Sequence, residues 1–198
     1  MLIDILLLDP PAYFTVVAIL IVSTCLHELA HGMAALSQGD DTPEYEEHMT
    51  WNPLVHFGGW MSLGSLLLTG TFRAYMPINP DWFEHPPWSG VLVYAAGCLM
   101  NLTLASFCFL LYRRCGMMGL ESSAIAAILL TTAQVNLMLG LANLVPIPPS
   151  DGFRILAELL PPLKALEPPR VYSWFLTGLF VATGCAMRLY HYLKPFHG

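Results

Sequence analysis

The sequence predicts an all-α, multi-pass membrane protein with about four transmembrane helices. Of its 198 residues, 56% are hydrophobic and only 11% are charged, whereas soluble domains usually carry about 25% charged residues. So few charges cannot coat a soluble globule of this size. Several uncharged segments recur along the chain, and each is long enough to cross a hydrocarbon core of about 30 Å as a helix.

The first of these segments extends from residue 12 to about residue 36 and has no charged residue before position 27. It carries the H-E-x-x-H spacing of zinc proteases in His27, Glu28 and His31. Positions i and i+4 share one face of a helix, so both histidines can point at one metal ion. The Glu28 carboxylate can then reach a water molecule without being a ligand.

The position of this motif inside a predicted membrane helix is informative. Ionisable residues at membrane depth are costly and are usually functional, and three of them fall within positions 27–31. A buried Glu–His pair that serves only helix packing is the alternative interpretation. Because a catalytic zinc needs three protein ligands and an open position, the two histidines are not a complete site.

Residues 51–80 predict a membrane-associated β-hairpin or a re-entrant segment between the first two membrane helices. Their apolar part, residues 57–71, is too short to span a membrane and contains several glycines, which oppose a helix. Such a segment must pack against protein or line a wet cavity, because unpaired backbone groups are not tolerated against lipid. The acidic residues 38–50 before it predict a loop outside the membrane.

Three later segments predict the remaining membrane helices, at residues 88–112, 122–145 and 171–193. Prolines after residue 145 end the third helix, since proline lacks a backbone donor. No internal repeat divides the chain, so we expect one domain over residues 1–198. Within it we expect a core at 12–156, the inserted hairpin at 51–80 and a C-terminal transmembrane helix at 171–193.

The charge balance argues against one class of partner. The formal net charge is −6 and only 8 residues are Lys or Arg, and because phosphate binding depends on such residues, nucleic acid is not an expected partner. The basic residues divide evenly between the two predicted sides of the membrane, so they do not set the orientation. The five cysteines form no C-x-x-C pair and predict no disulfide framework.

Asp151 is the best candidate for the third metal ligand. It follows the end of a predicted membrane helix, on the side where the helix bearing His27 also ends. An Asp-Gly turn after prolines explains the same residue equally well from spacing alone. The histidines His48, His56 and His85 are alternatives, and His56 could line the site because it opens the apolar segment.

Asn101 and Asn143 lie within or at the end of apolar spans. An amide without a partner is unfavourable in hydrocarbon, so each is expected to have a defined hydrogen-bond partner. One interpretation is helix–helix packing. The other is that these amides bind the backbone of an extended substrate, which would place them with His56 as substrate-binding residues.

Several segments, taken in order, resemble the site-2 protease family of intramembrane zinc metalloproteases, and in particular its small prokaryotic members. The H-E-x-x-H motif is followed by N-P-L-V-H-F-G at 52–58 and M-P-I-N-P at 76–80, which are similar to segments of that family. Residues 96–101 resemble its A-G-P-x-x-N pattern, and residues 143–152 resemble N-x-x-P-x-x-x-x-D-G. Cys98 stands where proline is usual, and Ser150 where leucine is usual.

The resemblance implies an intramembrane zinc endopeptidase that cleaves membrane proteins in or near their transmembrane segments, as in regulated intramembrane proteolysis. It implies one Zn²⁺ held by His27, His31 and Asp151, with Glu28 as general base. It also implies a multi-pass protein of the cell membrane whose active site opens towards the cytoplasm, with a transmembrane protein substrate and the lipid bilayer as partners. A catalytically silent scaffold of the same family and a metal-ion transporter are the alternative functions.

Overall fold

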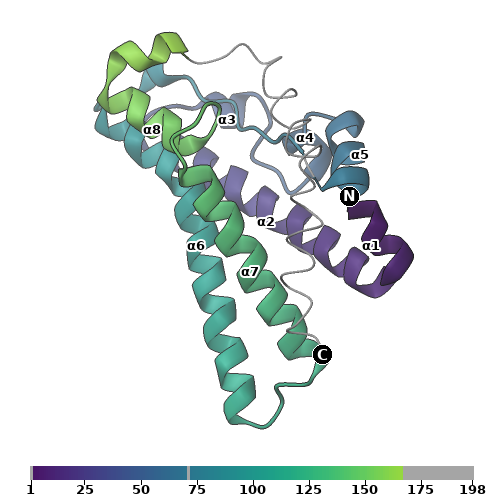
Figure 1. Ribbon diagram of the computed structural model, residues 1–198. Coiled ribbons are helices and arrows are strands. Elements are labelled where there is room, and N and C mark those ends of the chain that lie inside the picture. The colour runs from purple at the N-terminus through teal and green to yellow at the C-terminus, as the bar shows by residue number, and fades with distance from the viewer. Residues whose placement is uncertain (1, 71, 167–198) are drawn as a thin grey trace.

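The computed structural model describes residues 2–70 and 72–166, and this part of the chain is helical without strands. Figure 1 shows how the helices are arranged. In chain order they are α1 (Leu2–Leu8), α2 (Pro10–Ser37), α3 (Thr42–Tyr45), α4 (Pro53–His56), α5 (Trp60–Thr69), the 3-10 helix η1 (Pro80–Trp82), α6 (Trp88–Met117), α7 (Ala124–Leu144), α8 (Asp151–Leu159) and the 3-10 helix η2 (Pro161–Leu166). The predicted transmembrane helix at 171–193 lies outside the described residues.

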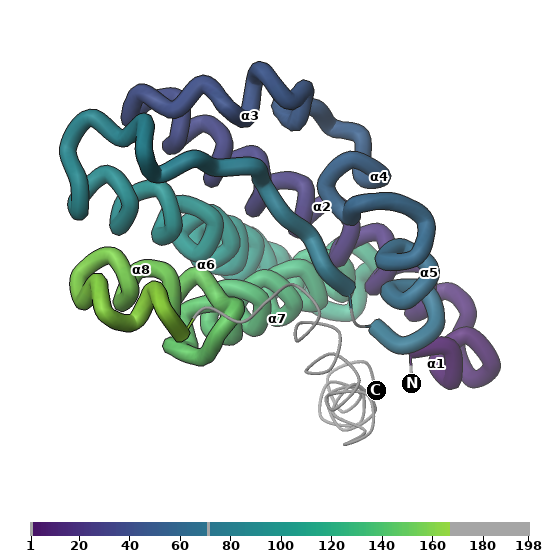
Figure 2. The backbone as a smooth tube through the Cα atoms, turned by 90° about the horizontal axis from the view of Figure 1, so that it is seen from above, coloured from purple at the N-terminus to yellow at the C-terminus, as the bar shows by residue number. Residues whose placement is uncertain are grey.

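Three of the described helices, α2, α6 and α7, are long and apolar enough to cross a membrane. These are the first three predicted spans. Helices α6 and α7 form an antiparallel pair, and α2 packs across both (Figure 1). Seen from above, α6 lies between α7 and α8 on one side and α2 with α3 on the other (Figure 2). Helix α6 is therefore the element against which α2, α7 and α8 pack.

Short polar caps begin the long helices where the sequence allows. The Asp9 side chain accepts a hydrogen bond from the backbone N–H of Ala12 at 3.1 Å, and prolines occupy the first turn of α2, where their missing donors are not needed. The Ser123 hydroxyl accepts from the N–H of Ala126 at 3.2 Å and caps α7. Helix α7 ends at Leu144, one residue before the first proline-restricted position.

The segment at 51–80 differs from the predicted β-hairpin. Its apolar part forms the α-helix α5, and no strand occurs at 51–70 or 72–80. The expectation that glycines exclude a helix here is wrong because two of them bound the helix. Gly59 at its N-cap has φ of 106° and Gly70 at its C-cap has φ of 82°, conformations that glycine adopts without a steric penalty.

Residues 72–79 belong to no helix or strand, and Figure 2 shows them as an extended run of chain that passes α5. The Ser62 hydroxyl accepts from the N–H of Arg73 and donates to its carbonyl, both at 2.7 Å. The N–H of Tyr75 donates to the carbonyl of His56 at 3.0 Å. The segment is thus a helix with an extended return, and its insertion into the membrane stays a prediction.

Asp40 joins the end of α2 to the chain that enters α6. Its side chain is fully buried, and its carboxylate accepts the N–H of Thr42 at 3.0 Å and that of Asn79 at 2.8 Å. Nearby, the Ser89 hydroxyl of α6 donates to the Gln38 side chain at 2.8 Å. These bonds fix residues 38–40, in the segment predicted as a loop outside the membrane, and they limit how far α2 can slide along α6.

We predict that Asp40→Ala lowers the free energy of unfolding, because two backbone donors lose their acceptor. An unsatisfied buried donor costs about 1–3 kcal/mol. Thermal unfolding of the purified chain in detergent measures the effect. Asp41→Ala is the matched control, since the exposed Asp41 makes no side-chain capping bond. Equal melting temperatures for the two variants would contradict this role of Asp40.

Candidate metal centre

Three ligand side chains converge at one buried point. The Nε2 atoms of His27 and His31 lie 3.0 Å apart, and Oδ2 of Asp151 lies 3.1 Å from the first and 3.3 Å from the second. Among residues 2–70 and 72–166, these three side chains form the single group of at least three His, Cys, Asp or Glu residues whose ligand atoms are close enough together to hold a metal ion. Two imidazoles and a carboxylate suit a zinc ion with a fourth position open.

Asp151 reaches this point through a tight connection between α7 and α8. A Cβ on Gly152 would lie 2.2 Å from the carbonyl oxygen of Leu144, so only glycine allows the chain to turn this closely. The Ser150 hydroxyl accepts the N–H of Phe153 at 3.2 Å and caps α8. Asp151 and Gly152 therefore begin helix α8, after the cap residue Ser150, and do not form the Asp-Gly turn that the sequence left as the alternative.

Gly97 of α6 forms one wall of the site. A Cβ at this position would lie 2.3 Å from Nε2 of His31 and 2.6 Å from Nε2 of His27. Any side chain there would displace the imidazoles from the point where they converge. Sequence reasoning missed this role, and the signal that could have found it is a glycine in the middle of an apolar helix with no turn or cap to explain it.

Hydrogen bonds behind the ligands orient them. Nδ1 of His31 lies 2.7 Å from the carbonyl oxygen of Val93, and because a carbonyl can only accept, this nitrogen carries the proton. The lone pair on Nε2 of His31 therefore points into the site. Asn101 places its side-chain amide 3.2 Å from Nδ1 of His27. The Cys98 thiol donates to Oδ2 of Asp151 at 3.6 Å.

The charges of the site favour an ionised Asp151. Burial alone would raise the pKa of its carboxyl group, but the adjacent imidazoles of His31 and His27 outweigh burial and hold that pKa well below its ordinary value. A carboxylate must be ionised to ligate a metal ion, and the direction of this pKa shift agrees with that role. Glu28 is buried beside the same imidazoles but does not belong to the ligand group.

His56 lies near Glu28 rather than among the ligands. It is fully buried at the end of α4, close enough to Glu28 for an electrostatic interaction. Its Nε2 donates to the carbonyl of Thr50 at 2.6 Å, and its Nδ1 has no hydrogen-bond partner within the described part of the chain. His48 donates instead to the carbonyl of Glu46 at 2.8 Å, and His85 is largely exposed. None of these three alternative histidines joins the ligand group.

The two asparagines of the sequence analysis have separate surroundings. Asn143 is half-buried near the end of α7, where its amide nitrogen donates to the carbonyl of Leu139 at 3.1 Å. Asn101 is buried behind His27. The structure therefore leaves Asn143 closer to solvent, whereas it holds Asn101 against a metal-ligand histidine.

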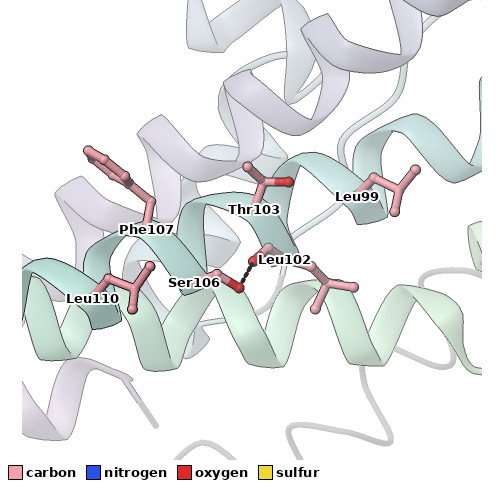
Figure 3. A pocket seen from close by; sticks show the side chains of 6 residues that line it. All are labelled: Leu99, Leu102, Thr103, Ser106, Phe107 and Leu110. Carbon is pink, nitrogen blue, oxygen red and sulfur yellow. Dashed lines mark hydrogen bonds between the residues drawn. The ribbon is translucent and has the colours of Figure 1, made fainter.

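An open groove of about 410 Å³ follows α6, and Figure 3 shows the side chains that line it. They are Leu99, Leu102, Thr103, Ser106, Phe107 and Leu110. All six belong to α6, and none of them is a member of the ligand group. The groove is mainly apolar and does not form the metal centre.

We predict that Gly97→Ala abolishes metal binding, because the added Cβ would overlap both imidazoles. Metal content per chain, measured by atomic emission after purification, checks this. Gly116→Ala is the matched control in the same helix, since a Cβ at Gly116 meets nothing within 4 Å. A folded Gly97→Ala protein with a full complement of metal would contradict the proximity of α6 to the site.

Comparison with known proteins supplies the reaction class. No protein-family model matches the chain, and no solved structure matches it. A protein of Bacillus subtilis (strain 168), "Putative zinc metalloprotease YwhC", is 37% identical over 148 residues, which cover 72% of this chain and 68% of that protein. With the buried ligand group, this similarity identifies zinc as the cofactor, one ion that His27, His31 and Asp151 could hold. The chain belongs to the same family of zinc metalloproteases.

Proposed function

We propose that this metalloprotease is an intramembrane endopeptidase that hydrolyses peptide bonds in or near the transmembrane segments of other membrane proteins. One observation carries the proposal. His27, Glu28 and His31 lie within α2, a helix long and apolar enough to cross a membrane. The family supports hydrolysis of peptide bonds with zinc, and the length and apolar character of α2 support a location of that reaction within the membrane.

The residues of the site have two roles, metal binding and proton transfer. His27, His31 and Asp151 would hold zinc, which when bound supplies Lewis acidity that activates water and polarises a carbonyl group. Glu28 is buried beside these ligands without being one. Its carboxylate is therefore free to accept a proton from the attacking water and to deliver it to the leaving amine.

The extended residues 72–79 offer a place to hold an unwound substrate. A helical substrate hides its carbonyl groups in hydrogen bonds, so it must become extended before hydrolysis. Backbone groups of alternate residues in an extended chain point to opposite sides. Because Arg73 and Tyr75 bond towards α4 and α5, the backbone groups of Ala74 and Met76 point the other way and could add a substrate strand.

This extended segment lies close to the metal centre. The Met76 side chain has its Sδ 3.2 Å and its Cε 3.1 Å from the position of a Cβ on Gly32, the residue after His31. A strand added beside residues 72–79 would therefore run next to the histidines. Asn143 is half-buried near the end of α7, and we propose that its amide bonds the substrate backbone.

The remaining parts of the proposal concern the membrane. We expect one domain over residues 1–198 whose fourth transmembrane helix is residues 171–193. Resemblance to the site-2 proteases supports a place in the cell membrane, with the end bearing Asp151 towards the cytoplasm. The partners are then a membrane-protein substrate and the bilayer, and nucleic acid is not expected.

Glu28→Gln should keep bound zinc and lose proteolysis. The amide has nearly the shape of the carboxylate but cannot accept a proton, and loss of a general base typically lowers the rate by about 10²–10⁴-fold. Cleavage of a model transmembrane substrate in detergent and zinc content are measured on the same preparation. Glu44→Gln, at an exposed position of α3, is the control. Cleavage by Glu28→Gln at the wild-type rate would reject the base assignment, and cleavage by neither enzyme would favour a silent scaffold.

Asp151→Ala should reduce zinc from about one ion per chain to a small fraction of that, because a site with two imidazole ligands is incomplete. Metal analysis after equilibrium dialysis against a zinc buffer tests it. Asp81→Ala, which removes an exposed carboxylate of η1, should retain the ion. Unchanged zinc affinity in Asp151→Ala would instead make His56 the better third ligand.

A further inference from the structure

We propose that Asn101 is a positioning residue for the metal centre. Its side-chain carbonyl accepts a hydrogen bond from Nδ1–H of His27 and so leaves Nε2 of that histidine unprotonated towards the metal. The inference deepens the proposed function and rests on it for the identity of the site. It assigns Asn101 to the ligand rather than to the substrate.

The neighbouring histidine shows which tautomer the site requires. His31 gives its Nδ1 proton to the carbonyl of Val93 at 2.7 Å and presents its Nε2 to Asp151. His27 presents the same atom, Nε2, to the same carboxylate at 3.1 Å. Both rings can ligate one ion only through Nε2, so both must carry their proton on Nδ1.

Asn101 is the group that meets Nδ1 of His27, at 3.2 Å. A protonated Nδ1 needs an acceptor, and of the two ends of an amide only the oxygen can accept. In the structure the amide nitrogen lies there, and Oδ1 is buried with no hydrogen-bond partner among residues 2–70 and 72–166. Oxygen and nitrogen of an amide have nearly the same shape, so the hydrogen-bond network decides between the two orientations.

The proton on His27 decides this case. With the nitrogen of Asn101 towards His27, the ring would have to carry its proton on Nε2, where it would occupy the direction of the metal. With the oxygen towards His27, Nε2 of the ring is free. The amide nitrogen then takes the buried position that Oδ1 holds in the other orientation, where the described residues offer no hydrogen-bond partner. Zinc binding therefore selects the orientation in which Oδ1 accepts, as metal-ligating histidines usually require.

Two other roles fit the surroundings of Asn101 less well. The side chain is only 1% exposed, so a substrate backbone could not reach it without moving His27. As a contact that only joins α6 to α2, it would resemble Asn136 of α7, whose amide donates to the Ser23 hydroxyl of α2 at 2.8 Å. Asn136 is equally buried, and its amide donates to Ser23 and Thr132 rather than to a ligand residue, which makes it the matched control.

The test compares zinc affinity and thermal stability in four purified full-length proteins: wild type, Asn101→Leu, Asn101→Asp and Asn136→Leu. Affinity is measured by competition with a chromophoric chelator, in detergent and without substrate. Asn101→Leu should weaken zinc binding about 10–100-fold, the usual effect of losing such a partner. Asn101→Asp keeps an acceptor and should stay within about threefold of wild type, which is small on that scale. Asn136→Leu should lower the melting temperature and leave affinity unchanged.

The cobalt-substituted proteins give a second measurement, because visible absorption bands report ligand geometry. Wild type and Asn101→Asp should share one spectrum, and Asn101→Leu should differ. Wild-type affinity in Asn101→Leu, or a loss in Asn101→Asp equal to that in Asn101→Leu, would overturn the proposal. Should Asn101→Leu not fold, a loss of about tenfold or more in Asn101→Asp would by itself overturn the proposal, because that variant keeps an acceptor. Since no substrate is present, the result is independent of whether the protein cleaves membrane proteins.

Discussion

The close approach of α6 to the histidine face of α2 is the constraint on which the rest of the structure depends. Gly97 leaves no side chain between the two helices, so the α6 backbone meets both imidazoles directly. The same helix then supplies the carbonyl of Val93 and the amide of Asn101 behind the two rings. Packing and chemistry are therefore inseparable here: what lets the helices touch also leaves space for the ion.

Around this contact, buried polar groups are paired across elements that are distant in sequence. Asp40 holds the chain before α6 against the end of α2, and the turn around Gly152 brings Asp151 of α8 to the histidines. A cation–π contact joins α8 to α6, with the Arg154 guanidinium 5.5 Å from the ring centre of Tyr94. A buried polar group without a partner is costly, so each of these pairs limits how far the helices can shift and keeps the ligand atoms in register.

The long helices and the pairing of the two histidines could be predicted, because both follow from hydrophobicity and residue spacing within a single segment. Uncharged stretches of helical length located α2, α6 and α7, and the i, i+4 spacing placed His27 and His31 together. Spacing alone could not choose Asp151 over a simple turn, since that depends on how α7 and α8 meet. The glycines around α5 misled the prediction because capping glycines and helix-breaking glycines have the same composition and differ only in position. The roles of Gly97 and Asn101 depend on contacts between separate helices. A glycine in the middle of an apolar helix indicates a close contact, but a single sequence does not reveal which residues it meets.

The central claim is that a metalloprotease site built into a membrane helix cleaves its substrates within the membrane. The most direct measurement is the position of the cleaved bond. Membrane proteins that accumulate with Glu28→Gln would be identified by comparative proteomics, then cleaved by the wild-type enzyme in liposomes, and the new termini sequenced by mass spectrometry. We predict cleavage within or at the edge of an apolar transmembrane segment. Cleavage confined to soluble loops far from any such segment would contradict the account.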